Sequence, residues 1–187
     1  MASTSDFKNG LIIDHKSNLW KITEFQHVKP GKGAAFVRSK LKNIRTGQVV
    51  DETFRAGEKI SIIRVEARNY NFLYSDNNFY TFMDNETYEQ IELTKIQVED
   101  VLDFLIENTE TTIAFNGSEP IEVRIPLHMN LKVVQADPGF KGDTAQGGTK
   151  PVTLETGVII QVPLFIEEGQ TVRVDTREKK YIERVKG

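Results

Sequence analysis

The chain has 187 residues, of which 39% are hydrophobic and 27% charged, and its formal net charge is −3, a composition that excludes a disordered tail. It contains no cysteine, so disulfides, thiolate zinc sites, iron–sulfur clusters and cysteine nucleophiles are excluded. No apolar run approaches the roughly 18 residues that cross a bilayer, and the sequence MASTSDFKNG lacks the regions of a signal peptide, so we expect a cytoplasmic protein with no membrane partner.

Most of the predicted elements are short strands. Runs rich in Val, Ile, Phe and Tyr recur between Gly, Pro, Asn and Asp residues, which is typical of strands separated by turns. These runs cover residues 19–28, 34–44, 60–65, 70–74, 78–83, 112–115, 121–125, 157–162 and 171–175. Their spacing predicts an all-β chain built from small barrels or sandwiches.

The first two of these strands are joined by a glycine-rich stretch, VKPGKGAAF. Pro30 and Gly31 predict a turn in which a fixed negative φ is followed by a positive one, and Gly33 relaxes the backbone after Lys32. Lys32 is therefore expected at the tip of a hairpin.

The strand that follows the hairpin tip alternates in polarity. Val37 and Leu41 are expected on one face, and Arg38, Lys40 and Lys42 on the other. A basic stripe thus leads up to the tip, and the phosphate backbone of a nucleic acid is the natural ligand for such a stripe.

One segment departs from the strand pattern. Its apolar residues fall at i, i+3, i+4, i+7 and i+8, the spacing of one face of an α-helix. They are Val98, Val101, Leu102, Leu105 and Ile106, and the opposite face carries Glu99, Asp100, Asp103 and Glu107. We expect a helix with an acidic outer face that caps a small barrel.

Charge is distributed unevenly along the chain. Residues 1–64 carry 12 Lys/Arg and 6 Asp/Glu, residues 65–127 carry 3 and 13, and residues 128–187 carry 9 and 8. This break in composition predicts a domain boundary near residue 64. A polyanion would meet the N-terminal third and be repelled by the middle, so contacts with RNA should be lopsided and sensitive to salt.

Three ordered stretches cover essentially the whole chain and share a resemblance. The first is VKPGKGAAF followed by VRSKLKNIRTG and TFRAGEKI, and the second is FLYSDNNFYTFMDNETYEQIEL. The third is DPGFKGDTAQGGTKPVTLETGVIIQVPLFIEEGQTVRVDTREKKYIERVKG. In this order they resemble the three domains of the bacterial elongation factor P family.

The resemblance implies an all-β protein of three consecutive barrels that together have the shape of a transfer RNA. A KOW-like, SH3-like domain would span residues 1–64, and two OB-type domains would span 65–127 and 128–187. It implies a translation elongation factor, acting as a monomer without cofactor or metal. Such a factor binds both ribosomal subunits beside the peptidyl-tRNA, between the peptidyl and exit sites, and stimulates peptide bond formation at consecutive prolines.

The resemblance also implies roles for single residues. Lys32 would be the functional tip that reaches the CCA end of the tRNA, presented by Pro30, Gly31 and Gly33, with Lys29 beside it as an RNA contact. In the family this lysine often carries a post-translational extension, such as β-lysyl or aminopentanol. The sequence identifies neither the extension nor the enzyme that would attach it.

Further RNA contacts are implied in the last third of the chain. The loop residues Gly142, Asp143 and Thr144 would approach the exit-site codon and the small subunit, although a plain barrel loop is an equal alternative. Tyr181 and Arg184 would contact tRNA or ribosomal RNA through a stacking face and a planar guanidinium. For Tyr181, a structural role in closing the last strand is equally consistent with the sequence.

Other classes of function fit less well. An enzyme is disfavoured because the three histidines are scattered and neither G-x-S-x-G nor H-E-x-x-H occurs, so no catalytic residue is assigned. A general OB-type module that binds single strands needs exposed aromatic residues on a basic surface. Phe72, Tyr74, Phe79, Tyr80 and Phe82 lie in the acidic middle and are expected in the core instead. An elongation factor P-like paralogue with another duty stays open.

Overall fold

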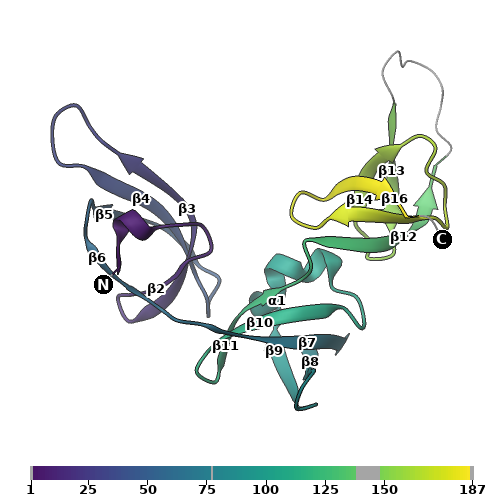
Figure 1. Cartoon of the computed structure of the whole chain (residues 1–187), viewed down its shortest axis with the longest axis horizontal. Helices are drawn as coiled ribbons and strands as arrows, with labels where there is room; N and C mark the ends of the chain where they lie inside the picture. The colour runs from purple at the N-terminus through teal and green to yellow at the C-terminus, as the bar shows by residue number, and fades with distance from the viewer. Residues whose placement is uncertain (1, 77, 138–147, 186–187) are drawn as a thin grey trace. The chain divides into compact units, whose positions relative to one another are not determined.

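A computed structural model describes residues 2–76, 78–137 and 148–185. Within these residues the regular structure consists mostly of β-strands, with one short α-helix and two 3-10 helices (Figure 1). The all-β prediction is therefore confirmed, and each of the nine predicted runs overlaps a strand. The chain divides into two compact units: Met1–Arg68, Leu93–Glu99 and Ile113–Val123 form the first, and Asn69–Glu92, Asp100–Thr112 and Arg124–Gly187 the second.

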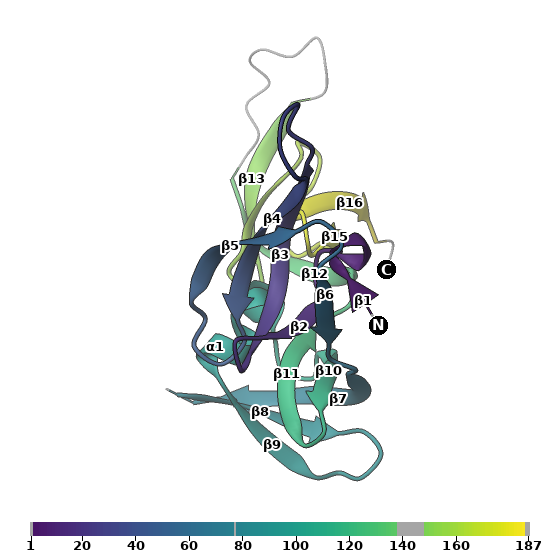
Figure 2. The ribbon, with the colours of Figure 1, turned by 90° about the vertical axis from the view of Figure 1, so that its left-hand side faces the viewer.

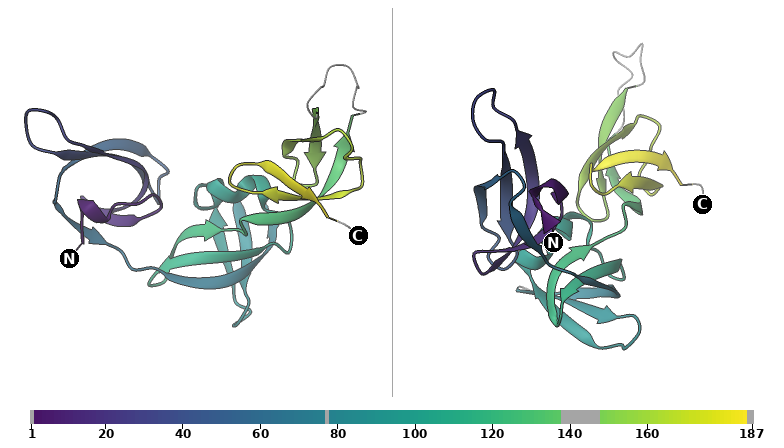
Figure 3. Two further views of the ribbon diagram at one scale, coloured as in Figure 1. Left: turned by 45° about the horizontal axis from the view of Figure 1, so that its top comes forward. Right: turned by 60° about the vertical axis from the view of Figure 1, so that its left-hand side comes forward.

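The N-terminal sheet has six strands: β1 (Ala2–Ser3), β2 (Ile12–His15), β3 (Asn18–Val28), β4 (Phe36–Asn43), β5 (Val49–Arg55) and β6 (Lys59–Ile62). Their order is β1-β6-β2-β3-β4-β5, with antiparallel pairing. The sheet curls around a common interior, as the left panel of Figure 3 shows. Seven buried apolar side chains fill it: Phe7, Ile13, Trp20, Ile22, Val37, Leu41 and Phe54. Each such side chain contributes about 1.5–3 kcal/mol to stability by leaving water.

Trp20 is the only tryptophan of the chain. It lies on β3 with 9% of its surface exposed. Its indole Nε1–H donates a hydrogen bond to the carbonyl oxygen of His15, with 3.0 Å between nitrogen and oxygen. The ring therefore has its one donor satisfied inside the N-terminal barrel.

The central sheet has the strands β7 (Glu66–Ser75), β8 (Phe79–Asp84), β9 (Gln90–Thr94), β10 (Glu110–Asn116) and β11 (Glu119–Arg124), in the order β11-β10-β7-β8-β9. Phe72 and Phe82 are buried opposite each other, with ring centroids 5.3 Å apart. The expectation that the aromatic residues lie in the core is wrong for Tyr74, which is 51% exposed, and for Phe79, which is 40% exposed. A bulge between Phe72 and Tyr74 breaks the alternation, and Phe79 lies at the hairpin end.

The predicted helix forms, but not as a continuous α-helix. An α-helical turn, α1 (Lys95–Val98), continues as the 3-10 helix η2 (Glu99–Phe104). The buried residues are Val98, Val101 and Phe104, at intervals of three, since side chains at i and i+3 eclipse in a 3-10 helix. Leu102, Leu105 and Ile106, which the 3.6-residue period also placed on the apolar face, are half-buried, and Ile106 packs against the C-terminal core. Phe104, which that period left out, is buried instead. The predicted acidic residues, Glu99, Asp100, Asp103 and Glu107, are exposed as expected.

The C-terminal sheet has the strands β12 (His128–Ala136), β13 (Thr149–Leu154), β14 (Ile159–Pro163), β15 (Thr171–Asp175) and β16 (Lys180–Arg184), in the order β14-β13-β12-β15-β16. The outermost strands β14 and β16 also lie close to each other, so the sheet curls toward closure. Its core contains Leu131, Val133, Leu154, Val162 and Val174 among others. Phe104 of η2 is buried in the same core, in the same compact unit.

Candidate functional site

The glycine-flanked lysine lies where the longest hairpin of the N-terminal sheet leaves the sheet. Strands β3 and β4 are paired from Trp20↔Asn43 to Val28↔Phe36, and residues 29–35 connect them beyond the last pair (Figure 2). Lys32 stands in the middle of this connection and is exposed. The expectation of a lysine at a hairpin tip is therefore met by the backbone.

The turn itself differs from the prediction. Gly33 has a φ of +110°, whereas Gly31 is not among the glycines with positive φ, so the expected positive φ at Gly31 is wrong. A Cβ at Gly33 would lie 3.8 Å from the Cγ of Pro30, an ordinary contact. It is thus the backbone conformation after Lys32, and not lack of space, that favours glycine at position 33.

The alternation predicted for β4 is present. Val37 and Leu41 are fully buried, and Arg38 on the opposite face is exposed. The guanidinium of Arg38 lies over the ring of Phe36, 5.5 Å from its centroid. This cation–π contact stiffens the side chain and leaves its charge uncompensated.

The other two cations of the stripe have carboxylate partners. The Nζ of Lys40 lies 3.2 Å from Glu24 Oε2, in a pair whose side chains are 41% and 70% exposed. The Nζ of Lys42 lies 2.9 Å from Glu99 Oε2, and its side chain is only 19% exposed. No carboxylate of the described residues lies within ion-pair distance of Lys29, Lys32 or Arg38. Within this hairpin, the cations without a carboxylate partner among the described residues are therefore the ones nearest the end that carries Lys32.

The C-terminal candidates lie on β16. Tyr181 pairs with Val174 and is half-buried against the C-terminal core, which supports its structural alternative. Arg184 is exposed, and its guanidinium lies 5.9 Å from the ring centroid of Phe165. Phe165 is 59% exposed and was missed by sequence reasoning. Its neighbour Ile166 is buried. The sequence alone does not show which of these two adjacent apolar residues faces the solvent.

The three predicted loop residues, Gly142, Asp143 and Thr144, lie outside the residues that the structure describes. Their roles stay predictions.

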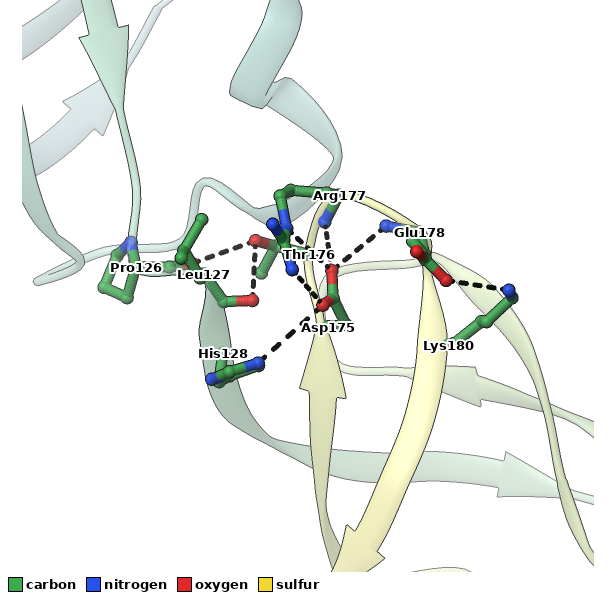
Figure 4. A network of polar contacts seen from close by, with 8 residues as sticks. All are labelled: Pro126, Leu127, His128, Asp175, Thr176, Arg177, Glu178 and Lys180. Carbon is green, nitrogen blue, oxygen red and sulfur yellow. Dashed lines mark hydrogen bonds and ion pairs between the residues drawn. The ribbon is translucent and has the colours of Figure 1, made fainter.

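A polar network joins the start of β12 to the turn between β15 and β16 (Figure 4). The hydroxyl of Thr176 donates toward the carbonyl oxygens of Pro126, at 2.9 Å, and Leu127, at 3.2 Å. The carboxylate of Asp175 accepts hydrogen bonds from the guanidinium and backbone N–H of Arg177. The hydrogen bond from the Arg177 guanidinium is the main reason why the pKa of Asp175 lies well below its ordinary value. Hydrogen bonds from the backbone N–H groups of Arg177 and Glu178 lower this pKa further. This network has the character of a structural anchor.

Other kinds of site are not found in the described parts of the chain. Residues 2–76, 78–137 and 148–185 contain no group of three His, Cys, Asp or Glu side chains that could hold a metal ion. The same ranges contain no helix that is long and apolar enough to cross a membrane.

Models of known families match three consecutive segments. Residues 3–60 match the elongation factor P (EF-P) KOW-like domain, residues 65–123 the elongation factor P (EF-P) OB domain, and residues 129–184 the elongation factor P C-terminal domain. Curled β-sheets with these three matches define a translation elongation factor.

Curated relatives match over the full length. The chain is 51% identical over 187 residues to the elongation factor P of Natranaerobius thermophilus, covering 100% of both chains. It is 53% identical over 184 residues to the elongation factor P of Moorella thermoacetica, covering 98% of this chain and 100% of the relative. The chain belongs to the elongation factor P family.

Among solved structures, the eukaryotic translation initiation factor 5A from Methanococcus jannaschii is similar at 19% identity with a TM-score of 0.48, covering 65% of this chain and 94% of that one.

Proposed function

We propose that the chain binds both subunits of the ribosome beside the peptidyl-tRNA, between the peptidyl and exit sites, and stimulates peptide bond formation at consecutive prolines. The observation that carries this proposal is the exposed Lys32 on a long paired hairpin, with no carboxylate partner among the described residues. An ammonium group presented in this way is available to donate hydrogen bonds to phosphate and ribose oxygens.

In this proposal the protein positions the tRNA, and the ribosome carries out the chemistry. Proline has a fixed φ and stiffens a nascent chain, which draws the peptidyl-tRNA out of its reactive geometry. The ammonium of Lys32 contacts the CCA end and restores that geometry. Correct alignment of two reactants is worth up to about 7–11 kcal/mol in well-oriented systems, so a part of this is sufficient to recover a stalled step. The protein itself is then not an enzyme and needs no cofactor.

We also propose that Lys32 is the target of a modifying enzyme. The side chain is exposed and lies between two glycines, so an enzyme can approach its amine from several sides. An extension that keeps a terminal cation lengthens the reach without changing the charge.

We assign the remaining RNA contacts to the cations that have no carboxylate partner among the described residues. Lys29 and Arg38 bind phosphate next to Lys32, while Lys40 and Lys42 contribute less because each has a carboxylate partner. On the C-terminal sheet Arg184 binds phosphate, and Tyr181 supports β16. The loop residues Gly142, Asp143 and Thr144 stay in the proposal on the resemblance alone.

The proposal includes a monomer of three domains, residues 1–64, 65–127 and 128–187, that works in the cytoplasm where ribosomes are. Each of the three sheets is formed by consecutive strands, and this supports the division.

The test is translation in vitro of a message with three consecutive proline codons, with ribosomes lacking the endogenous factor. Lys32→Ala should lose most of the stimulation and keep its melting temperature, because exposed substitutions usually change stability by less than about 0.5 kcal/mol. Lys8→Ala, at another exposed lysine of the same unit, is the matched control and should act as the parent protein does. Full stimulation by Lys32→Ala would rule out Lys32 as the functional tip.

A further inference from the structure

Two lysines face each other at the base of the Lys32 hairpin. Lys21 on β3 is the direct cross-strand partner of Lys42 on β4. Like charges in this position repel each other and destabilise the strand pair. Each lysine has its own carboxylate, since Lys21 Nζ lies 2.8 Å from Glu122 Oε1 and Lys42 Nζ lies 2.9 Å from Glu99 Oε2. The repulsion is thus removed by carboxylates from a distant part of the sequence.

A third pair lies at the turn that follows β4. Arg45 Nε donates to Glu119 Oε1 at 2.6 Å and Arg45 Nη2 donates to Glu119 Oε2 at 2.8 Å, which is the two-point geometry of a strong charge-assisted contact. The backbone N–H of Arg45 donates a hydrogen bond to Asn43 Oδ1 at 2.9 Å, so the turn holds the backbone of the arginine in place. The hydrogen bond from Arg45 lowers the pKa of Glu119 and raises the pKa of Arg45.

The same unit that contains these ion pairs also contains a buried apolar cluster. Ile12 of β2, Ala114 of β10 and Ile121 of β11 form a buried cluster. Leu19, Ile44, Ile63 and Val65 pack around it. At Gly47 a Cβ would lie 3.4 Å from the Cγ2 of Ile96, so the β4–β5 turn lies close against α1. The N-terminal sheet and the segments from the central sheet are thus joined by both apolar packing and ion pairs, the two kinds of contact found in specific protein interfaces.

All these residues belong to one compact unit, in which the N-terminal sheet packs against residues 93–99 and 113–123. The carboxylates come only from those two segments, and the cations come only from β3, β4 and the turn after β4. Part of the positive charge of the first 64 residues is therefore neutralised by carboxylates of the same chain.

The contact lies at the opposite end of the hairpin from Lys32. From Lys21 to Val28 the strand rises by roughly 23 Å, at about 3.3 Å per residue. A tilt of about 5° at the base moves the tip by roughly 2 Å over that length. A displacement of about 1 Å is enough to change the rate of an alignment-dependent reaction by about 100-fold.

We propose that this contact sets the direction of the Lys32 hairpin, and that Lys21, Lys42 and Arg45 are positioning residues that act through Lys32. The proposal rests on the proposed function for its effect on translation. It assigns Lys42 chiefly to Glu99, in agreement with the smaller contribution to RNA binding proposed for it.

A charge exchange tests the proposal. Arg45→Glu should lower the rate on a three-proline message by about tenfold or more, and Arg45→Glu with Glu119→Arg should restore at least half of it. Lys16→Glu breaks another ion pair of the same sheet, with Glu52 at 2.8 Å, and should leave the rate unchanged. Melting temperatures of all variants identify any that fail to fold.

A second readout needs no ribosome. The chain has no cysteine, so two cysteines introduced at the exposed positions Gln26 and Lys95 would be the only sites to which spin labels attach. The two labels report one distance within the first unit. The distribution should be narrow in the parent, broad or shifted in Arg45→Glu, and narrow again in the charge-exchanged double variant. An unchanged distribution in a folded Arg45→Glu variant overturns the proposal, and so does a double variant that restores neither distance nor rate. If the parent protein does not stimulate translation of the proline message, the proposed function is wrong. The spin-label distances then test by themselves whether the contact positions the hairpin.

Discussion

The ammonium group of Lys150 donates a hydrogen bond to the carbonyl oxygen of Asp137, with 2.9 Å between Nζ and O. Lys150 lies on β13 opposite Val162 and is only 8% exposed. A buried lysine requires a partner for its charge, because an unpaired ammonium in a protein interior costs several kcal/mol. The carbonyl of Asp137 supplies that partner at the end of β12, so the bond joins two strands of the C-terminal barrel.

We expect Lys150→Met to lower the free energy of unfolding by about 1–3 kcal/mol, because the substitution keeps the apolar stem and removes a charged donor. Lys132→Met, at an exposed position of β12, is the control and should stay within about 0.5 kcal/mol of the parent. Urea unfolding of both variants measures the difference. Equal midpoints for the two variants would show that the Lys150 bond does not contribute.

A pair of glycine substitutions separates the shape of the hairpin tip from its charge. Gly33→Ala forces a Cβ onto a φ of +110°, whereas Gly31→Ala meets neither a positive φ nor an atom within 4 Å. We expect Gly33→Ala to reduce stimulation of a proline message with Lys32 intact, and Gly31→Ala to keep most of it. If Gly31→Ala were the more damaging of the two, the backbone conformation would not be what the tip requires.

The 3-10 period of η2 makes a clear prediction about packing. Phe104 is 2% exposed in the C-terminal core, so Phe104→Ala should cost about 3–5 kcal/mol. Leu105→Ala, at the adjacent half-buried position, should cost clearly less. Chemical denaturation of the two variants tests this order, and a larger loss for Leu105→Ala would favour the α-helical period.

The network around Asp175 predicts a dependence of stability on pH. Because its folded-state pKa lies below the ordinary value of 3.8, the carboxylate stabilises the fold above that pH. The contribution is lost as the pH falls through the folded-state pKa. Carbon-detected NMR should show Asp175 titrating below the ordinary range in the parent protein. Arg177→Gln should raise this pKa, because the guanidinium hydrogen bond is its largest cause. Arg173→Gln removes the cation paired with Glu183 and should leave it unchanged.

The proposed RNA contacts predict different salt dependences for neighbouring cations. Arg38→Gln should weaken ribosome binding and reduce the slope of log affinity against log salt by about one, since one phosphate contact is lost. Lys40→Gln should reduce the slope less, because Glu24 lies 3.2 Å from its ammonium. Ribosome co-sedimentation at several salt concentrations measures both slopes. Equal slopes for both variants would contradict the assignment by uncompensated charge.

Local patterns predicted the parts of this fold that depend on near neighbours. The alternation from Val37 to Lys42 fixed which face of β4 is buried, because a strand has a period of two. Strand β5, with the sequence VVDETFR, was missed because only Phe54 of it is buried, and one buried residue leaves no pattern. The sequence did not distinguish an α-helix from a 3-10 helix at residues 99–104, because the spacing of Val98 and Val101 fits a period of three as well as one of 3.6.

Contacts between distant residues could not be predicted. Lys42 reads as one cation of a basic stripe until the fold places Glu99, 57 residues later, beside it. Arg45 and Glu119 are 74 residues apart, and nothing in either local sequence links them. The sequence also could not show that the positive φ lies at Gly33 and not at Gly31, because glycine adopts either sign of φ at both positions.

The single tryptophan gives the protein an internal optical probe. Trp20 is the only indole in the chain and lies inside the barrel that carries the hairpin, where it is shielded from water and bound to His15. Its fluorescence therefore reports the opening of that one barrel, while circular dichroism reports all three sheets. A red shift that precedes the loss of β-structure would identify the N-terminal barrel as the first part to unfold, and coincident transitions would identify a single cooperative unit.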